Sequence, residues 1–185
     1  EVYFAEGCSL TGSSKEGFEE AIKITEKSDV AILFMGNSSP ETEGEGKDRC
    51  SLDLPGVQED LIREICNMQV PVIVVLINGS AITMTGWVDK VKAVVEAWYP
   101  GEEGGNAIAD VLFGDYNPGG RLPITFPRKV GQLPLYYNYK PTGRGYDYVD
   151  LRGEQPLFPF GYGLSYTRFE YTNLKINPEL SLIHI

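Results

Sequence analysis

One continuous apolar segment, Pro71-Val72-Ile73-Val74-Val75-Leu76-Ile77, constrains the fold of this chain more than any other stretch. It is far shorter than the roughly 20 residues of a membrane span. We interpret it as a strand buried on both faces, as a parallel sheet requires. Residues 29–35 have the same character, and segments with helical spacing lie around both runs. This alternation predicts a mainly parallel sheet in a three-layer α/β/α sandwich.

Helix signals flank the two apolar runs. Ser13 followed by Glu16 is a capping-box pattern that predicts the start of a first helix. Pro55 suits the first turn of a second helix. The apolar faces of these two helices are expected to be Phe18, Ala21, Ile22 and Thr25, and Val57, Leu61, Ile62 and Ile65. Further strands are expected at residues 2–4, 91–98 and 122–126, and a further helix at residues 104–113.

The pattern changes at about Pro127, where Pro, Gly and Tyr dominate and periodicity fades. We divide the chain into an α/β sandwich (residues 1–126), an extended wrapping segment of the same domain (127–168) and the start of a linker (169–179). Residues 180–185 resemble the in-frame translation of a sequencing-library adapter. We therefore expect this tail, including His184, to be non-native.

Composition excludes several classes of function. The formal net charge of -10 argues against nucleic acid or an anionic membrane as the main partner. The three cysteines, Cys8, Cys50 and Cys66, lack the spacing of a disulfide framework or a zinc site. We interpret them as reduced or buried thiols, and we expect neither a metal nor a cofactor.

An acidic loop directly after the 29–35 run is the strongest candidate for chemistry. It carries Glu41, Glu43 and Glu45 at alternate positions, with Lys47 and Arg49 following. Ligands of open α/β sheets bind beyond the carboxyl ends of the strands. Crowded carboxylates raise one another's pKa, so one of them could act as a general acid.

From the residues alone, a solvated acidic loop is the favoured interpretation, a general acid/base carboxylate comes second and metal binding third. Lys47 and Arg49 would limit the total charge and hold the loop through ion pairs. Asp48-Arg49 is interpreted as a structural pair and not as a ligand contact.

Templates for other sites fail or remain open. An EF-hand loop starting at Glu41 would need Glu where Leu52 stands, and the Gly46-Lys47 pair lacks the rest of a phosphate loop. A Ser-His-Asp arrangement has no credible histidine. Trp98 and Tyr99, at the end of the 91–98 run, could stack on a sugar or simply pack; we favour packing. The turn-rich loop 117–123 is interpreted as structural.

Taken together, the motifs resemble those of the second, sandwich domain of glycoside hydrolase family 3. The stretches that carry this resemblance stand in order along nearly all of residues 2–173. They are Ser28-Asp29-Val30-Ala31 leading to Gly36, Glu43-Gly44-Glu45-Gly46-Lys47-Asp48-Arg49, Leu52-Asp53-Leu54-Pro55-Gly56, Trp98-Tyr99-Pro100-Gly101-Glu102-Glu103-Gly104-Gly105, Asp110-Val111-Leu112-Phe113-Gly114-Asp115, Asn117-Pro118-Gly119-Gly120-Arg121-Leu122-Pro123 and Pro159-Phe160-Gly161-Tyr162-Gly163-Leu164-Ser165-Tyr166-Thr167.

The resemblance implies retaining exo-hydrolysis of β-linked sugars, with no cofactor. In that family the nucleophile is an aspartate on a preceding barrel domain, and this loop supplies the acid/base glutamate. The matching residue is Glu45, three before Asp48; Glu43 is the runner-up because the alternating glutamates allow a two-residue slip. The expected partners are a β-linked oligosaccharide or glycoside and the barrel domain, which this chain lacks. We therefore expect the chain alone to be inactive.

Substrate and location are less constrained. Residues 133–144 look more like β-glucosidase members than β-xylosidases, so a β-glucosidase is expected and a β-xylosidase is the alternative. A non-catalytic carbohydrate-binding or scaffold domain is a rival from another class, although a scaffold has no need for Glu45. A nucleotide-binding domain fits the fold but lacks a phosphate loop. Family members are often periplasmic or secreted, and some are cytoplasmic.

Overall fold

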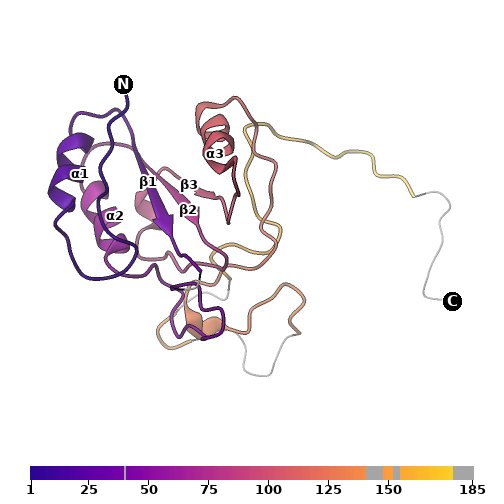
Figure 1. Ribbon diagram of the computed structural model, residues 1–185. Coiled ribbons are helices and arrows are strands. Elements are labelled where there is room, and N and C mark those ends of the chain that lie inside the picture. Colours follow the sequence, from indigo (N-terminus) through magenta and orange to yellow (C-terminus); the bar gives the residue numbers. More distant parts are fainter. Residues whose placement is uncertain (40, 141–147, 152–154, 177–185) are drawn as a thin grey trace.

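The computed structural model describes residues 1–39, 41–140, 148–151 and 155–176. Its centre is a parallel sheet of three strands in the order β1-β2-β3, with β1 at Ala31–Gly36, β2 at Val72–Ile77 and β3 at Ala93–Glu96 (Figure 1). The predicted α/β sandwich with a mainly parallel sheet is therefore confirmed. The predicted third strand, 91–98, is shorter than expected; Ala93 is exposed and the other three residues of β3 are partly buried.

Three α-helices flank the sheet: α1 (Phe18–Thr25), α2 (Gln58–Cys66) and α3 (Gly104–Phe113). In Figure 1, α1 and α2 lie side by side on one side of the sheet and α3 lies on the other. The described residues also form two short 3-10 helices, η1 (Val88–Lys90) and η2 (Val130–Gln132). The bounds of α3 agree with the predicted helix, and Gly114, with a φ of 86°, ends it as a left-handed cap.

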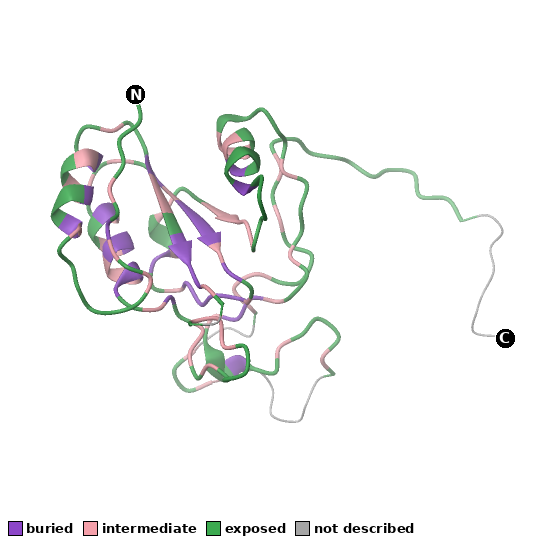
Figure 2. Cartoon of the chain, viewed as in Figure 1, coloured by how far each residue is buried: buried purple, intermediate pink, exposed green. Residues whose placement is uncertain are grey.

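The core lies between α1, α2 and the sheet. Strand β2 is its centre, because Val74, Val75 and Leu76 are fully buried (Figure 2). The predicted face of α2 meets it, with Ile62 and Ile65 also fully buried. A continuous apolar strand between two neighbours thus buries both of its faces, as the sequence pattern indicated.

Both predicted helix starts are wrong. Helix α1 begins at Phe18 with Gly17 as its N-cap, and no side chain caps it; the Ser14 hydroxyl instead accepts a hydrogen bond from the backbone N–H of Glu16 (3.4 Å). Helix α2 begins at Gln58 and not at Pro55, because Gly56 between them adopts a φ of 63°, outside the helical region.

Two predicted strands are also wrong. Residues 2–4 join no strand in the described part of the chain, and Val2 and Phe4 are highly exposed. Residues 122–126 form only antiparallel backbone bonds to residues 157–162, with one bridge between Phe126 and Phe158. Pro123 lacks an N–H donor and interrupts a regular ladder there.

Candidate functional site

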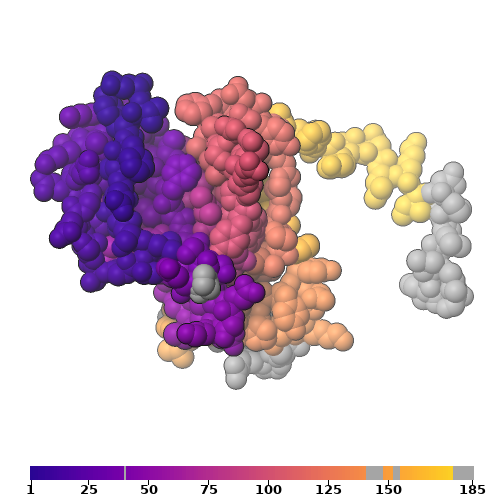
Figure 3. All heavy atoms as spheres, viewed as in Figure 1, coloured from indigo at the N-terminus to yellow at the C-terminus, as the bar shows by residue number. Residues whose placement is uncertain are grey.

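The acidic loop begins where β1 ends, at the carboxyl edge of the sheet. The strands are in register there, since the N–H of Asn37 donates to Ile77 O (2.9 Å) and the N–H of Ala97 donates to Leu76 O (2.9 Å). The segments after all three strands therefore leave the sheet beside one another. On the molecular surface the loop lies next to the orange segment that begins near residue 127 (Figure 3).

A tight turn at Ser38 starts the loop. The N–H groups of Thr42 and Glu43 both donate to Ser38 O (2.9 and 3.2 Å), and the Thr42 hydroxyl accepts from the N–H of Ser38 (2.9 Å). This turn directs the side chain of Glu43 back towards the sheet.

Glu43 is held by groups from two other segments. Its Oε2 accepts hydrogen bonds from the N–H of Gly79 (3.0 Å), after β2, and from the hydroxyl of Tyr99 (2.8 Å), after β3. Burial acts to raise the pKa of this carboxyl group. The Ser80 hydroxyl beside it, the two hydrogen bonds and the positive charge of Arg49 act in the opposite direction, so the pKa of Glu43 lies below its ordinary value. We expected crowding to raise the pKa of a loop carboxylate; for Glu43 that expectation is wrong.

Glu45 occupies a different environment two residues further on. It is exposed, as are Gly46, Lys47 and Asp48. The N–H of Lys47 donates to Gly44 O (3.0 Å), which places Glu45 second in a four-residue turn. Gly46, third in the turn, has a φ of 76°, a value that favours glycine. The carboxyl group of Glu45 is thus presented outward at a turn, while Glu43 points inward.

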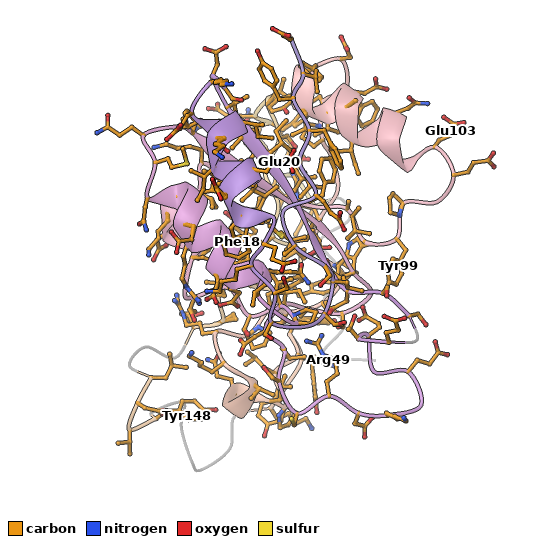
Figure 4. All side chains as sticks on the ribbon, turned by 60° about the vertical axis from the view of Figure 1, so that its left-hand side comes forward. Phe18, Glu20, Arg49, Tyr99, Glu103 and Tyr148 are labelled. Carbon is orange, nitrogen blue, oxygen red and sulfur yellow. The ribbon has the colours of Figure 1, made fainter. Side chains whose placement is uncertain are left out.

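Arg49 fixes the far end of the loop. Its guanidinium donates to the backbone oxygen of Asp53 (2.6 Å), and the carboxylate of Asp53 accepts hydrogen bonds from the hydroxyls of Ser51 (2.9 Å) and Thr83. Figure 4 shows Arg49 within the curl of the loop and Tyr99 approaching the loop from the segment after β3. Among the described residues, Arg49 forms no ion pair with Asp48, so the predicted structural pair is wrong.

Glu96 is a buried carboxylate near Glu43 that the sequence reasoning missed. It is the last residue of β3, and its Oε1 accepts a hydrogen bond from the N–H of Trp98 (3.2 Å). Burial raises its pKa to about 7; the Trp98 N–H and the side chain of Asn78 oppose this rise, and the negative charge of Glu43 adds to it. A carboxylate that ends an otherwise apolar strand was the available signal.

The two aromatic candidates take different roles. Trp98 is partly buried and packs edge-on against Phe126, with ring centroids 6.0 Å apart. Packing was the favoured interpretation of Trp98, and this contact agrees with it. Tyr99 is about half exposed, at 48%, and its hydroxyl is engaged by Glu43.

Other features of the described residues bear on the site. A cavity of about 280 Å³ opens beside the end of β1, lined among others by Glu6, Asn37 and Gln58, but neither Glu43 nor Glu45 lines it. No group of three or more His, Cys, Asp or Glu residues in the described ranges is arranged to hold a metal ion. None of the helices described has the length and apolar character needed to cross a bilayer.

Comparisons with known proteins place these features in a family. Residues 2–166 match the glycosyl hydrolase family 3 C-terminal domain. A β-xylosidase of Formosa agariphila is 46% identical, over 95% of this chain and 24% of its own length. The thermostable β-glucosidase B of Acetivibrio thermocellus is 42% identical, over 95% of this chain and 25% of its own length.

A solved structure agrees with these relatives. The β-glucosidase of Erythrobacter marinus superimposes with a TM-score of 0.82 at 37% identity, over 93% of this chain and 26% of its own. The chain spans about a quarter of the length of the curated relatives it matches. Sequence and structure agree, and the chain belongs to the C-terminal domain family of glycosyl hydrolase family 3.

Proposed function

We propose that this chain is the acid/base-bearing domain of a retaining, exo-acting β-glycosidase, and that Glu45 is its acid/base residue. One observation carries the assignment: Glu45 presents an exposed carboxyl group at a turn whose two sides are fixed by Glu43 and Arg49. A group that must meet a sugar held by another domain has to be accessible yet held in place. The names of the relatives, β-glucosidase and β-xylosidase, support the reaction class.

The proposed chemistry divides between two domains. An aspartate on a barrel domain attacks the anomeric carbon while Glu45 donates its proton to the departing glycosidic oxygen. The resulting Glu45 carboxylate then takes a proton from a water molecule, whose oxygen attacks the anomeric carbon and releases the aspartate. A retaining pair stands about 5–5.5 Å apart. Glu45 therefore has to lie at the interface between the two domains.

Glu43 suits the acid/base role less well. Its lowered pKa keeps it ionised, and its Oε2 already accepts two hydrogen bonds. A general acid must hold a proton near neutral pH and must reach the leaving oxygen. Among the carboxyl groups of the loop, Glu43 is therefore the structural one.

Replacing Glu45 in the full-length enzyme tests the assignment. We expect Glu45→Gln to lower kcat/KM by about 10²- to 10⁴-fold for glycosides with poor leaving groups, since these need a proton. Formation of the glycosyl-enzyme from a dinitrophenyl glycoside, which needs little acid assistance, should be nearly unchanged. Pre-steady-state release of dinitrophenol measures that step. An equal loss on both substrates would contradict the assignment.

Two controls accompany this experiment. Glu43→Gln is the matched variant, and it should not produce the dependence on the leaving group. The 185-residue chain alone, which carries no nucleophilic aspartate on a barrel, should release no nitrophenol from an aryl β-glucoside. Turnover by the purified chain would show that the catalytic pair is not divided as proposed.

We propose that the full-length enzyme removes a terminal glucose unit, which makes it a β-glucosidase. The name of the structural neighbour from Erythrobacter marinus supports this choice. The 46% identity to the β-xylosidase of Formosa agariphila favours xylose as the second candidate. A comparison of kcat/KM for the 4-nitrophenyl β-glucoside and β-xyloside by the full-length enzyme decides between them.

A further inference from the structure

We propose that Tyr99, together with Gly79, holds Glu43 in a clasp that positions the loop carrying Glu45, so that Tyr99 is a positioning residue for the proton transfer. The proposal rests on the function proposed above only for its catalytic consequence. The clasp itself joins the ends of β2 and β3 to the acidic loop, which follows β1.

The contacts make the clasp specific. The two donors to Glu43 Oε2 come from residues 36 and 56 positions further along the chain. A carboxylate that accepts from a backbone N–H and from a hydroxyl is fixed in direction as well as in position. Glu43 lies only two residues before Glu45, so this anchor controls the near side of the turn that presents Glu45.

Gly79 leaves the space that the clasp needs. A Cβ atom at position 79 would lie 2.9 Å from Cε2 of Tyr99 and 3.2 Å from Cδ of Glu43. Any side chain there would therefore push apart the two groups that the hydrogen bond joins. Position 79 therefore requires glycine, because the side chains of Tyr99 and Glu43 lie too close to its backbone for a Cβ atom.

The backbone after β3 aims Tyr99 at the loop. Trp98 adopts a φ of 52°, a left-handed value that a bulky residue rarely takes. Its ring is held by the edge-on contact with Phe126. Strain of this kind persists where surrounding packing maintains it, and it is common at functional sites. Here it turns the chain so that the next residue, Tyr99, meets Glu43.

The environment of Tyr99 also favours its protonated form, in which the hydroxyl can donate. Burial, and then the hydrogen bond and negative charge of Glu43, raise its pKa to about 12. Its phenol thus keeps its proton up to about pH 12, well above the pH at which the Glu43 carboxylate ionises. Because the hydroxyl donates to Glu43, the contact ties the direction of the Tyr99 side chain to the acidic loop.

Trypsin cleavage after Lys47 in the 185-residue chain reports on the clasp without any catalysis, because Lys47 is exposed in the turn. We expect Tyr99→Phe to speed this cleavage about 5- to 30-fold, as loss of one charge-assisted hydrogen bond allows. Gly79→Ala should speed it similarly while keeping the hydroxyl. Tyr166→Phe is the matched control, because that hydroxyl donates to Val111 O (2.5 Å), away from the loop. Wild-type cleavage rates in both Tyr99→Phe and Gly79→Ala would overturn the clasp.

Kinetics of the full-length enzyme test the catalytic consequence. Tyr99→Phe should lower kcat for poor leaving groups by about 5- to 30-fold with little change in KM. Glu43→Gln keeps an oxygen acceptor and should retain most activity, whereas Glu43→Ala removes both hydrogen bonds of the clasp and should lower kcat at least as much as Tyr99→Phe. A rise in KM alone would assign Tyr99 to sugar binding and overturn the positioning role. If cleavage after Lys47 changes as expected but Glu45→Gln shows no dependence on the leaving group, the clasp stands and the acid/base assignment fails.

Discussion

At the scale of single residues, three carboxyl groups near one edge of the sheet differ in environment. Glu43 is clasped and ionised, Glu45 is exposed at a turn, and Glu96 is buried with a pKa of about 7. The positions of these three residues in the sequence do not reveal the difference, because segments distant in sequence form the environment of each carboxyl group. The same residue type therefore occupies three environments within one small region: an anchor at Glu43, the proposed proton donor at Glu45 and a buried group at Glu96 whose protonation depends on pH.

Glu96 makes stability depend on pH. Its folded-state pKa of about 7 lies above the ordinary value of 4.5, so the folded chain binds this proton more tightly than the unfolded chain. Its contribution to stability is complete below pH 4.5 and is lost as the pH rises towards 7, at up to about 1.4 kcal/mol per pH unit. Glu96→Gln should remove this loss. Urea titrations of both proteins give the difference in free energy of unfolding, variant minus wild type. This difference should rise between pH 4.5 and 7 and level off above pH 7. A difference independent of pH would show that Glu96 is not buried as described.

The candidate site was only partly predictable at this scale. The loop was located by its place after a buried strand, and the choice of Glu45 within it came from the family motif. The clasp could not be predicted, because Gly79 and Tyr99 are ordinary turn residues until the sheet brings them beside Glu43. Glu96 was missed because the pattern of its strand was assessed for burial and not for the charge at its end.

At the scale of elements, the bounds of helices and strands were predicted better from patterns of apolar residues than from local signals for the start of a helix. The β2 run and α3 were predicted almost to the residue. The β2 run is continuous, rich in Val and Ile and too short for a helix, whereas α3 has helical spacing and ends at Gly114. The capping box at Ser13 failed because the turn before α1 satisfies its backbone groups differently, with Gly17 as the cap. Residues 122–126 have strand composition, but Pro123 leaves them only isolated antiparallel contacts.

The packing of α2 on the sheet can be measured directly. Ile62 is fully buried on α2, whereas Ile176 is 71% exposed. We expect Ile62→Ala to lower the free energy of unfolding by about 2–5 kcal/mol, because it removes apolar contacts and leaves a cavity. Ile176→Ala, the same substitution at an exposed site, should change it by less than about 0.5 kcal/mol. Denaturant unfolding measures both, and equal effects would contradict the assigned core.

At the scale of the whole molecule, the chain combines a buried parallel sheet with a long exposed segment. The residues from 168 to 176 are all exposed and extend away from the body of the molecule (Figure 1). The predicted tail at residues 180–185 lies outside the described residues, as does part of the 133–144 stretch used for substrate choice. The proposed account gives this chain one half of a catalytic pair, presented at the carboxyl edge of its sheet towards another domain.

Azide rescue in the full-length enzyme tests this account most directly. Without its base, Glu45→Gln should accumulate the glycosyl-enzyme from a dinitrophenyl β-glucoside, because water can no longer be deprotonated as it attacks. Azide needs no deprotonation, so it should restore turnover and give the β-glycosyl azide. Glu43→Gln should gain nothing from azide. Rescue of Glu43→Gln with no rescue of Glu45→Gln would contradict the account and would assign the acid/base role to the inward-facing carboxylate.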